Sequence, residues 1–100
     1  MAISDAIQRG AAYCIYGSSG KQTATVPVQV GELLGICNDF IILRQGGLYL
    51  TCGEDGRKIG TLPVLVGDFK NAAGNTFNLV KNGIIYSYNK KCQKTGMRPA

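Results

Sequence analysis

Apolar and polar residues alternate along most of the chain with a period of two, which is typical of β-strands with one buried face. Two β-branched runs, Thr23–Val30 and Gly60–Val66, each carry a proline near the middle, Pro27 and Pro63. Because proline donates no hydrogen bond to a strand ladder, both prolines are expected at sheet edges or bulges. Each run is therefore predicted to bend into two short strands.

Two hairpins are predicted, over residues 40–51 and 77–88. Asn82-Gly83 is the preferred pair for a type I′ turn, because both central positions need a positive φ. Residues 45–47 have the same role in the first hairpin. Alternation places Tyr86 and Tyr88 on one face, and we expect them to be partly buried with their hydroxyls reaching solvent.

The N-terminal segment gives two conflicting signals. Ser4 is a suitable cap for a short helix, whereas an internal alignment of the chain places Ala6-Ile7 on a strand. We expect a short helical turn or a loose arm there, followed by a strand from Ala11 to Tyr16.

One segment of the chain is written twice. Residues 17–33 align with residues 53–69 at a shift of 36, with glycine, threonine, proline and valine identities. Residues 40–49 align with residues 77–86 at a shift of 37, which predicts a one-residue insertion near residues 71–76. Because a unit of this size cannot bury its apolar face alone, the copies are expected to pack on each other.

The two ends of the chain match halves of the same unit. Residues 8–13 resemble the end of a unit, and residues 94–99 resemble the start of one. We predict a single β domain over residues 1–100, with units at 17–52 and 53–89 and a third unit split between 1–16 and 90–100. The predicted fold is all-β, a small pseudo-symmetric barrel or sandwich of tandem repeats of about 36 residues. The ends either complete a unit within one chain or are completed by neighbouring chains.

The four cysteines, Cys14, Cys37, Cys52 and Cys92, have no counterparts between the two copies. Duplicated disulfide scaffolds normally duplicate their cysteines, so free, partly buried thiols are favoured, with a single bridge as the alternative. Zinc is not expected, because the chain has no C-x-x-C pair and no histidine. No cofactor is predicted.

An enzymatic function is not predicted. General base catalysis most often uses histidine, which the chain lacks. The Gly17–Lys21 and Gly53–Arg57 elements resemble phosphate loops, but each is followed by a β-branched strand instead of a helix, so both are predicted to be turns.

The net charge is +5, and no acidic residue follows Asp68. A basic end of this kind attracts nucleic acid, anionic membrane or an acidic protein surface, or it simply aids solubility. No apolar run is long enough for a membrane span, and no export signal is evident. We therefore expect a soluble protein with no membrane partner.

The stretch Pro27–Ile36, P-V-Q-V-G-E-L-L-G-I, resembles a motif of small β-rich phage capsid decoration proteins. The second copy keeps P-V-L-V-G-D-F over Pro63–Phe69, and the two hairpins resemble those of phage head-fibre and C1q/TNF-like tips. This resemblance implies a virion surface protein that oligomerises and clamps capsid subunits.

The predicted function is that of a non-enzymatic structural protein that docks on a viral shell and forms homo-oligomers, located in the virion. One alternative is a lectin-like module that binds glycans through Tyr13, Tyr49 and Tyr86, with Asn38, Asn75 and Asn82 nearby. A second alternative is a small nucleic-acid-binding barrel that uses the basic end and tyrosine stacking. The candidate contacts for a partner or ligand are Tyr13, Tyr49, Tyr86, Tyr88, Lys90, Lys91, Lys94 and Arg98.

Overall fold

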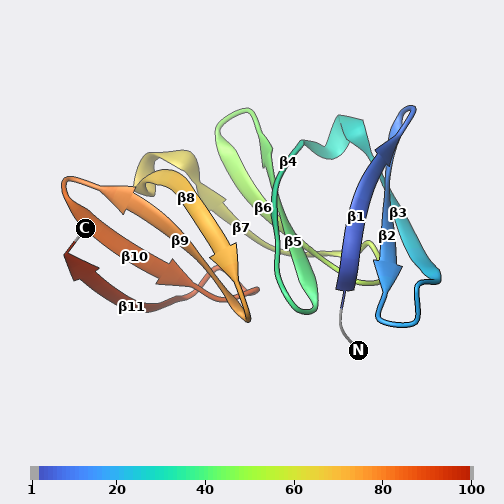
Figure 1. Ribbon diagram of the computed structural model, residues 1–100. Helices are drawn as coiled ribbons and strands as arrows, with labels where there is room; N and C mark the ends of the chain where they lie inside the picture. The colour runs from blue at the N-terminus through green and yellow to red at the C-terminus, as the bar shows by residue number, and fades with distance from the viewer. Residues whose placement is uncertain (1–2, 100) are drawn as a thin grey trace.

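The computed structural model describes residues 3–99 and contains eleven strands in three antiparallel sheets (Figure 1). The first sheet contains β1 (Ile3–Arg9), β2 (Ala12–Gly17) and β3 (Gln22–Pro27). The middle sheet contains β4 (Glu32–Ile36), β5 (Phe40–Gln45), β6 (Leu48–Gly53) and β7 (Lys58–Pro63). The third sheet contains β8 (Asp68–Ala73), β9 (Thr76–Lys81), β10 (Ile84–Tyr88) and β11 (Lys94–Pro99). The all-β prediction is confirmed.

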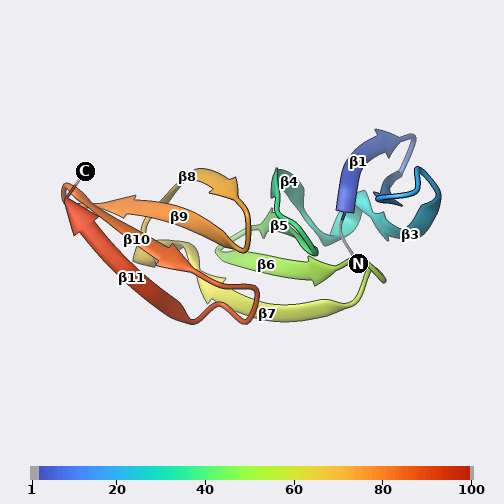
Figure 2. The ribbon, with the colours of Figure 1, turned by 60° about the horizontal axis from the view of Figure 1, so that its bottom comes forward.

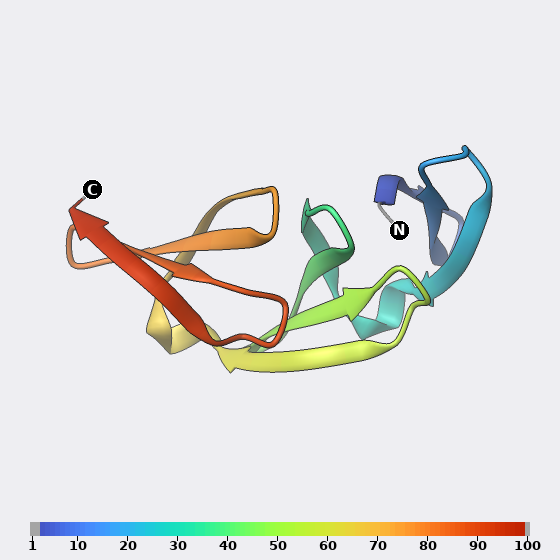
Figure 3. The same ribbon diagram turned by 90° about the horizontal axis from the view of Figure 1, so that it is seen from below.

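The middle sheet lies between the other two, and both of its faces are covered (Figures 2 and 3). Ile41 and Leu43 point toward the first sheet and pack with Ile15 and Val26. Ile42, between them in sequence, points the other way and packs against the third sheet. A strand buried on both faces reads as a continuous apolar run, which explains the sequence F-I-I-L in β5.

The two prolines end edge strands, as predicted, but the prediction that each run bends into two short strands is wrong. Pro27 ends β3 and Pro63 ends β7, and a short 3-10 helix follows each, η1 (Val28–Val30) and η2 (Val64–Val66). These two helical turns carry the chain from one sheet to the next. Gly31 follows η1 and lies so close to β5 that a Cβ atom there would be 2.6 Å from the Arg44 carbonyl oxygen.

Tight two-residue turns connect the first two strands of the first sheet and the corresponding strands of the other sheets. They lie at Gly10-Ala11, Gly46-Gly47 and Asn82-Gly83, at positions 36 residues apart (10, 46, 82). Asn82 and Gly83 have φ values of 54° and 78°, which confirms the type I′ prediction. The predicted one-residue insertion is wrong. A shift of 37 would align Gly46 with Gly83, but the turns set the strand register, and by the turns Gly46 corresponds to Asn82.

The N-terminal segment is a strand, and the predicted helical turn is wrong. Residues Ile3–Arg9 pair with β2 over most of their length. Ser4 does not cap a helix, because its hydroxyl donates to the Gly17 carbonyl at 2.8 Å. Cross-strand pairing and the burial of Ala6 therefore outweigh the local capping signal.

The two described ends of the chain lie at opposite ends of the molecule (Figures 1 and 3). β1 and β11 belong to different sheets, so the ends do not complete a common sheet within one chain. The sheets cover residues 3–27, 32–63 and 68–99.

The thiol prediction is confirmed, since the cysteines, Cys14, Cys37, Cys52 and Cys92, are all free. Within residues 3–99 there is no helix long and apolar enough to cross a membrane.

Candidate functional site

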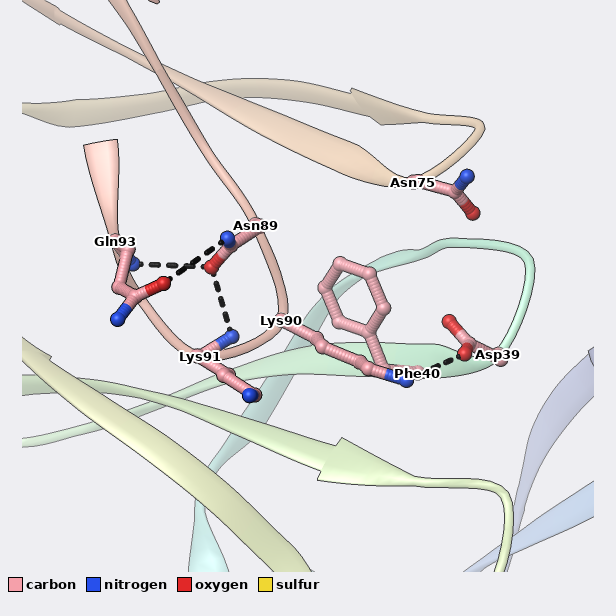
Figure 4. A pocket seen from close by; sticks show the side chains of 7 residues that line it. All are labelled: Asp39, Phe40, Asn75, Asn89, Lys90, Lys91 and Gln93. Carbon is pink, nitrogen blue, oxygen red and sulfur yellow. Dashed lines mark hydrogen bonds and ion pairs between the residues drawn. The ribbon is translucent and has the colours of Figure 1, made fainter. Parts of the chain in front are cut away.

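A polar hollow of about 360 Å³ opens where the middle and third sheets meet (Figure 4). Three separate turns supply its walls: the β4–β5 turn, the β8–β9 turn and the β10–β11 turn. Its lining residues are Asp39, Phe40, Asn75, Asn89, Lys90, Lys91 and Gln93. We call this feature the polar hollow.

The β10–β11 turn is held by Asn89. The Asn89 Oδ1 atom accepts hydrogen bonds from the backbone N–H groups of Lys91 at 3.0 Å and Gln93 at 3.1 Å (Figure 4). Such side-chain bonds to the backbone two residues on stabilise tight turns. They fix the backbone from which Lys90 and Lys91 extend.

An ion pair joins the third sheet to the middle sheet across the polar hollow. The Lys90 Nζ atom lies 2.8 Å from Asp39 Oδ2 (Figure 4). The hydrogen bond and the charge of Asp39 raise the pKa of the Lys90 amine. The Lys90 backbone is fixed as well, because its carbonyl accepts a hydrogen bond from the buried Thr51 hydroxyl, which in turn accepts the Gly60 N–H at 3.0 Å.

Corresponding turns of the three sheets have the same backbone hydrogen bonds but different side chains. The bonds run from Gly17 to Lys21, from Gly53 to Arg57 and from Asn89 to Gln93, at a spacing of 36 (17, 53, 89). The two central residues are Ser18-Ser19 in the first turn, Glu54-Asp55 in the second and Lys90-Lys91 in the third. The backbone is thus constant, while charge distinguishes the turns.

The third of these turns has a cysteine where the others have glycine. Gly20 and Gly56 have φ values of 82° and 81°, and Cys92 has a φ of 60°. A positive φ is unfavourable for a non-glycine residue. The Cys92 side chain packs against the core cluster between the middle and third sheets, which offsets that cost.

The described residues provide no cluster of metal-ligating side chains, and three of the thiols among them have raised pKa values. No group of three His, Cys, Asp or Glu side chains within residues 3–99 is placed to hold a metal ion. Burial, together with the negative charge of Asp39, raises the pKa of the Cys37 thiol to about 11. Burial also raises the pKa of Cys52 and of Cys92. Because the thiolate is the nucleophile, these thiols are poorly suited to covalent catalysis at neutral pH.

The structure divides the predicted tyrosine contacts between the interior and the surface. Tyr13 and Tyr49 are buried, and their hydroxyls bond to backbone: Tyr13 accepts the Leu33 N–H at 3.2 Å, and Tyr49 donates to the Gly67 carbonyl at 2.7 Å. Tyr88 is buried, so its expected partial exposure is not observed.

Tyr86 is half-buried, and the Lys94 ammonium lies 5.5 Å from its ring centroid. The burial of Tyr13, Tyr49 and Tyr88 places their rings in the packing between sheets.

The predicted basic contacts are all in the third sheet or its turns, but they do not form one site. Lys90 and Lys91 line the polar hollow, Lys94 lies over Tyr86, and Arg98 lies on the face turned away from the middle sheet. The sequence reasoning missed three residues that line the polar hollow beside the lysines, Asp39, Asn89 and Gln93, whereas it named Asn75 as a possible glycan contact. The alignment of Asn89 with Gly17 and Gly53 would have indicated the turn.

The net charge is confined to one end of the molecule. Residues 3–67 contain five basic and five acidic side chains, whereas residues 68–99 contain six basic side chains and one acidic side chain. The first and middle sheets are therefore neutral together, and the third sheet carries the whole excess.

No protein-family model matches the chain, and no curated protein matches it significantly.

Proposed function

We propose that the chain is a non-enzymatic assembly protein that docks on an acidic protein shell and forms homo-oligomers. The observation that carries this proposal is the charge separation, with the excess positive charge on the third sheet and its turns. A charged end of this kind steers a protein to an oppositely charged surface and orients it there. Lys91 and Arg98 are both exposed and are the main docking residues of the proposal.

The proposed shell is a viral capsid, and the virion is the proposed location. This choice is supported by the resemblance of Pro27–Ile36 to capsid decoration proteins. In the structure this stretch comprises the end of β3, η1 and β4, and thus links the first sheet to the middle sheet.

Co-sedimentation with shells assembled from the major capsid protein of the genome that encodes the chain tests the proposal. Wild-type protein should sediment with shells in about 50 mM salt and dissociate in about 500 mM salt, because surface charge pairs are screened. The variant Lys91→Glu/Arg98→Glu should bind at least about tenfold more weakly. The matched control is Lys21→Glu/Lys58→Glu, which changes the net charge equally on the first and middle sheets and should leave binding unchanged.

Two outcomes would contradict the proposal. One is wild-type protein that remains in the supernatant at low salt. The other is equal loss of binding in the two charge variants, which would point to net charge alone. Salt-sensitive binding to duplex DNA without binding to shells would favour the nucleic-acid alternative.

A second candidate function, binding of a small polar ligand such as a sugar, is supported by the polar hollow. The amides of Asn75, Asn89 and Gln93 and the carboxylate of Asp39 provide both donors and acceptors there. Titration with a panel of mono- and disaccharides, followed by NMR, should shift the amide signals of residues 89–93 if this function holds. Unchanged spectra at high sugar concentration would count against it.

A further inference from the structure

The first sheet has an uncovered outer face whose pattern matches faces that are buried elsewhere. On this face Ile7, Cys14 and Thr25 lie side by side across β1, β2 and β3. Adding 36 to each number gives the corresponding row of the middle sheet, Leu43, Leu50 and Thr61. Adding 36 again gives that of the third sheet, Leu79, Tyr86 and Met97. In both of those sheets the first two residues of the row pack against the preceding sheet. The first sheet has no preceding sheet within residues 3–99, and Ile7 is 40% exposed, although Cys14 beside it is only 6% exposed.

The outer face of the third sheet does not complement this surface. Asn78 and Ser87 stand there where the middle sheet has Ile42 and Thr51. Ser87 Oγ donates to Asn78 Oδ1 at 2.6 Å, and Asn78 Nδ2 donates to Asn71 Oδ1 at 2.7 Å. The adjacent row of this face contains Val80, Ile85 and Arg98, and Ile85 is already buried. A hydrogen-bonded polar row beside a charged residue is typical of the terminal cap of a stack and disfavours head-to-tail growth.

The outer face of the first sheet is complementary to itself. The row on one side of Ile7 and Cys14 contains Asp5 and Tyr16, and the row on the other side contains Arg9 and Ala12. A two-fold axis along the central row places Asp5 opposite Arg9 of a second molecule. The same axis places the large side chain of Tyr16 opposite the small one of Ala12.

We infer that this face binds the same face of a second copy of the chain, so that the protein forms a two-fold symmetric dimer by packing sheet on sheet. The alternative two-fold axis runs along the strands, at right angles to the central row. It would place β1 opposite β3 of the second molecule and leave Asp5 and Arg9 without an opposite charge. The proposed function includes the formation of homo-oligomers, and this dimer identifies the surface that forms them. The inference rests on the proposed function only through that oligomerisation. The face is small, so the dimer is expected to be weak, with association over roughly 10 µM to 1 mM chain.

Charge reversal tests this inference. Asp5→Arg and Arg9→Asp should each weaken dimerisation about tenfold in sedimentation equilibrium, because like charges would then face each other twice per dimer. The double variant should return to within about threefold of wild type, since every pair is opposite in sign again. Within one chain Asp5 and Arg9 are about 13 Å apart along the strand, so a rescue must arise between molecules.

A cysteine cross-link gives an independent readout. Ile7→Cys in a Cys14→Ser/Cys92→Ser background should form a disulfide-linked dimer on mild oxidation, because residue 7 lies on the proposed axis. Cys14 must be removed as well, since it pairs with Ile7 across β1 and β2 and would otherwise form a disulfide within one chain. Ile59→Cys in the same background is the matched control, since Ile59 is 38% exposed on a different strand, and it should give no disulfide-linked dimer. Wild-type protein that is monomeric at the highest concentration, or no rescue in the double variant, would overturn the inference. Shell binding that fails while dimers persist would instead refute the proposed docking function.

Discussion

The outer faces of the first and third sheets are the two ends of one stack, and they differ in chemistry. The first carries the exposed Ile7 in a row flanked by one acidic and one basic residue, whereas the third carries a hydrogen-bonded polar network beside Val80, Ile85 and Arg98. All of the net charge lies with the third sheet. The difference indicates that a shared pattern of strands is adapted at each end: one end suits packing on a neighbour, and the other suits water and acidic surfaces.

The largest effect on stability is expected when a residue of a covered sheet face is replaced by its counterpart from an uncovered face. Ile42 in the middle sheet is fully buried, and Asn78 is its counterpart in the third sheet, 36 residues on. Ile42→Asn should lower the free energy of unfolding by about 4 kcal/mol, because it leaves a buried amide without partners and removes packing. Asn78→Ile should change it by no more than about 1 kcal/mol. Urea unfolding measures both, and equal losses would contradict the difference between the two faces.

The contact between the middle sheet and the third turn is tested at Gly60. A Cβ atom at Gly60 would lie 3.0 Å from the Lys91 backbone, whereas Gly96, at the corresponding place in the third sheet, has nothing within 4 Å. Gly60→Val should therefore destabilise the protein by about 2 kcal/mol, and Gly96→Val should have little effect. Thermal unfolding of the two variants checks this expectation. A Gly96→Val loss as large as that of Gly60→Val would show that the outer face is covered.

The junction of the middle and third sheets should also weaken at high pH. Cys37 has a pKa of about 11 in the folded protein against 9.0 for an unperturbed thiol. Between these values the unfolded chain loses its proton first, so stability is full below pH 9 and falls as the pH rises to 11. The loss should be on the order of 2 kcal/mol. Urea titrations at several pH values should show this slope, and Cys37→Ala should reduce it; an unchanged slope would mean that other groups cause the loss.

The strands and turns were predictable where glycine and proline positions decide them. Asn82-Gly83 and the edge prolines Pro27 and Pro63 lie as the sequence indicated. The one-residue insertion was predicted wrongly because aligned aromatic residues were weighted above turn residues, although turns determine register. The strand at Ile3–Arg9 was missed because the local capping signal of Ser4 was preferred to the internal alignment that places Ala6-Ile7 on a strand.

The polar hollow depends on contacts that no local pattern reveals. Asp39 and Lys90 are separated by 51 residues, and they meet only because two sheets pack together. The burial of Tyr13 and Tyr49 depends in the same way on covered sheet faces. Alternation indicates that a tyrosine faces one side of a sheet, but the neighbouring sheet decides whether that side is open.

The claim that the two ends of the stack have different roles is tested most directly by sedimentation velocity on mixtures of the chain with capsid shells. Asp5→Arg should abolish most of the dimer and leave binding to shells unchanged. Lys91→Glu/Arg98→Glu should do the reverse, keeping the dimer and losing the shells. Loss of both properties in either variant, or of neither property in both, would contradict the account.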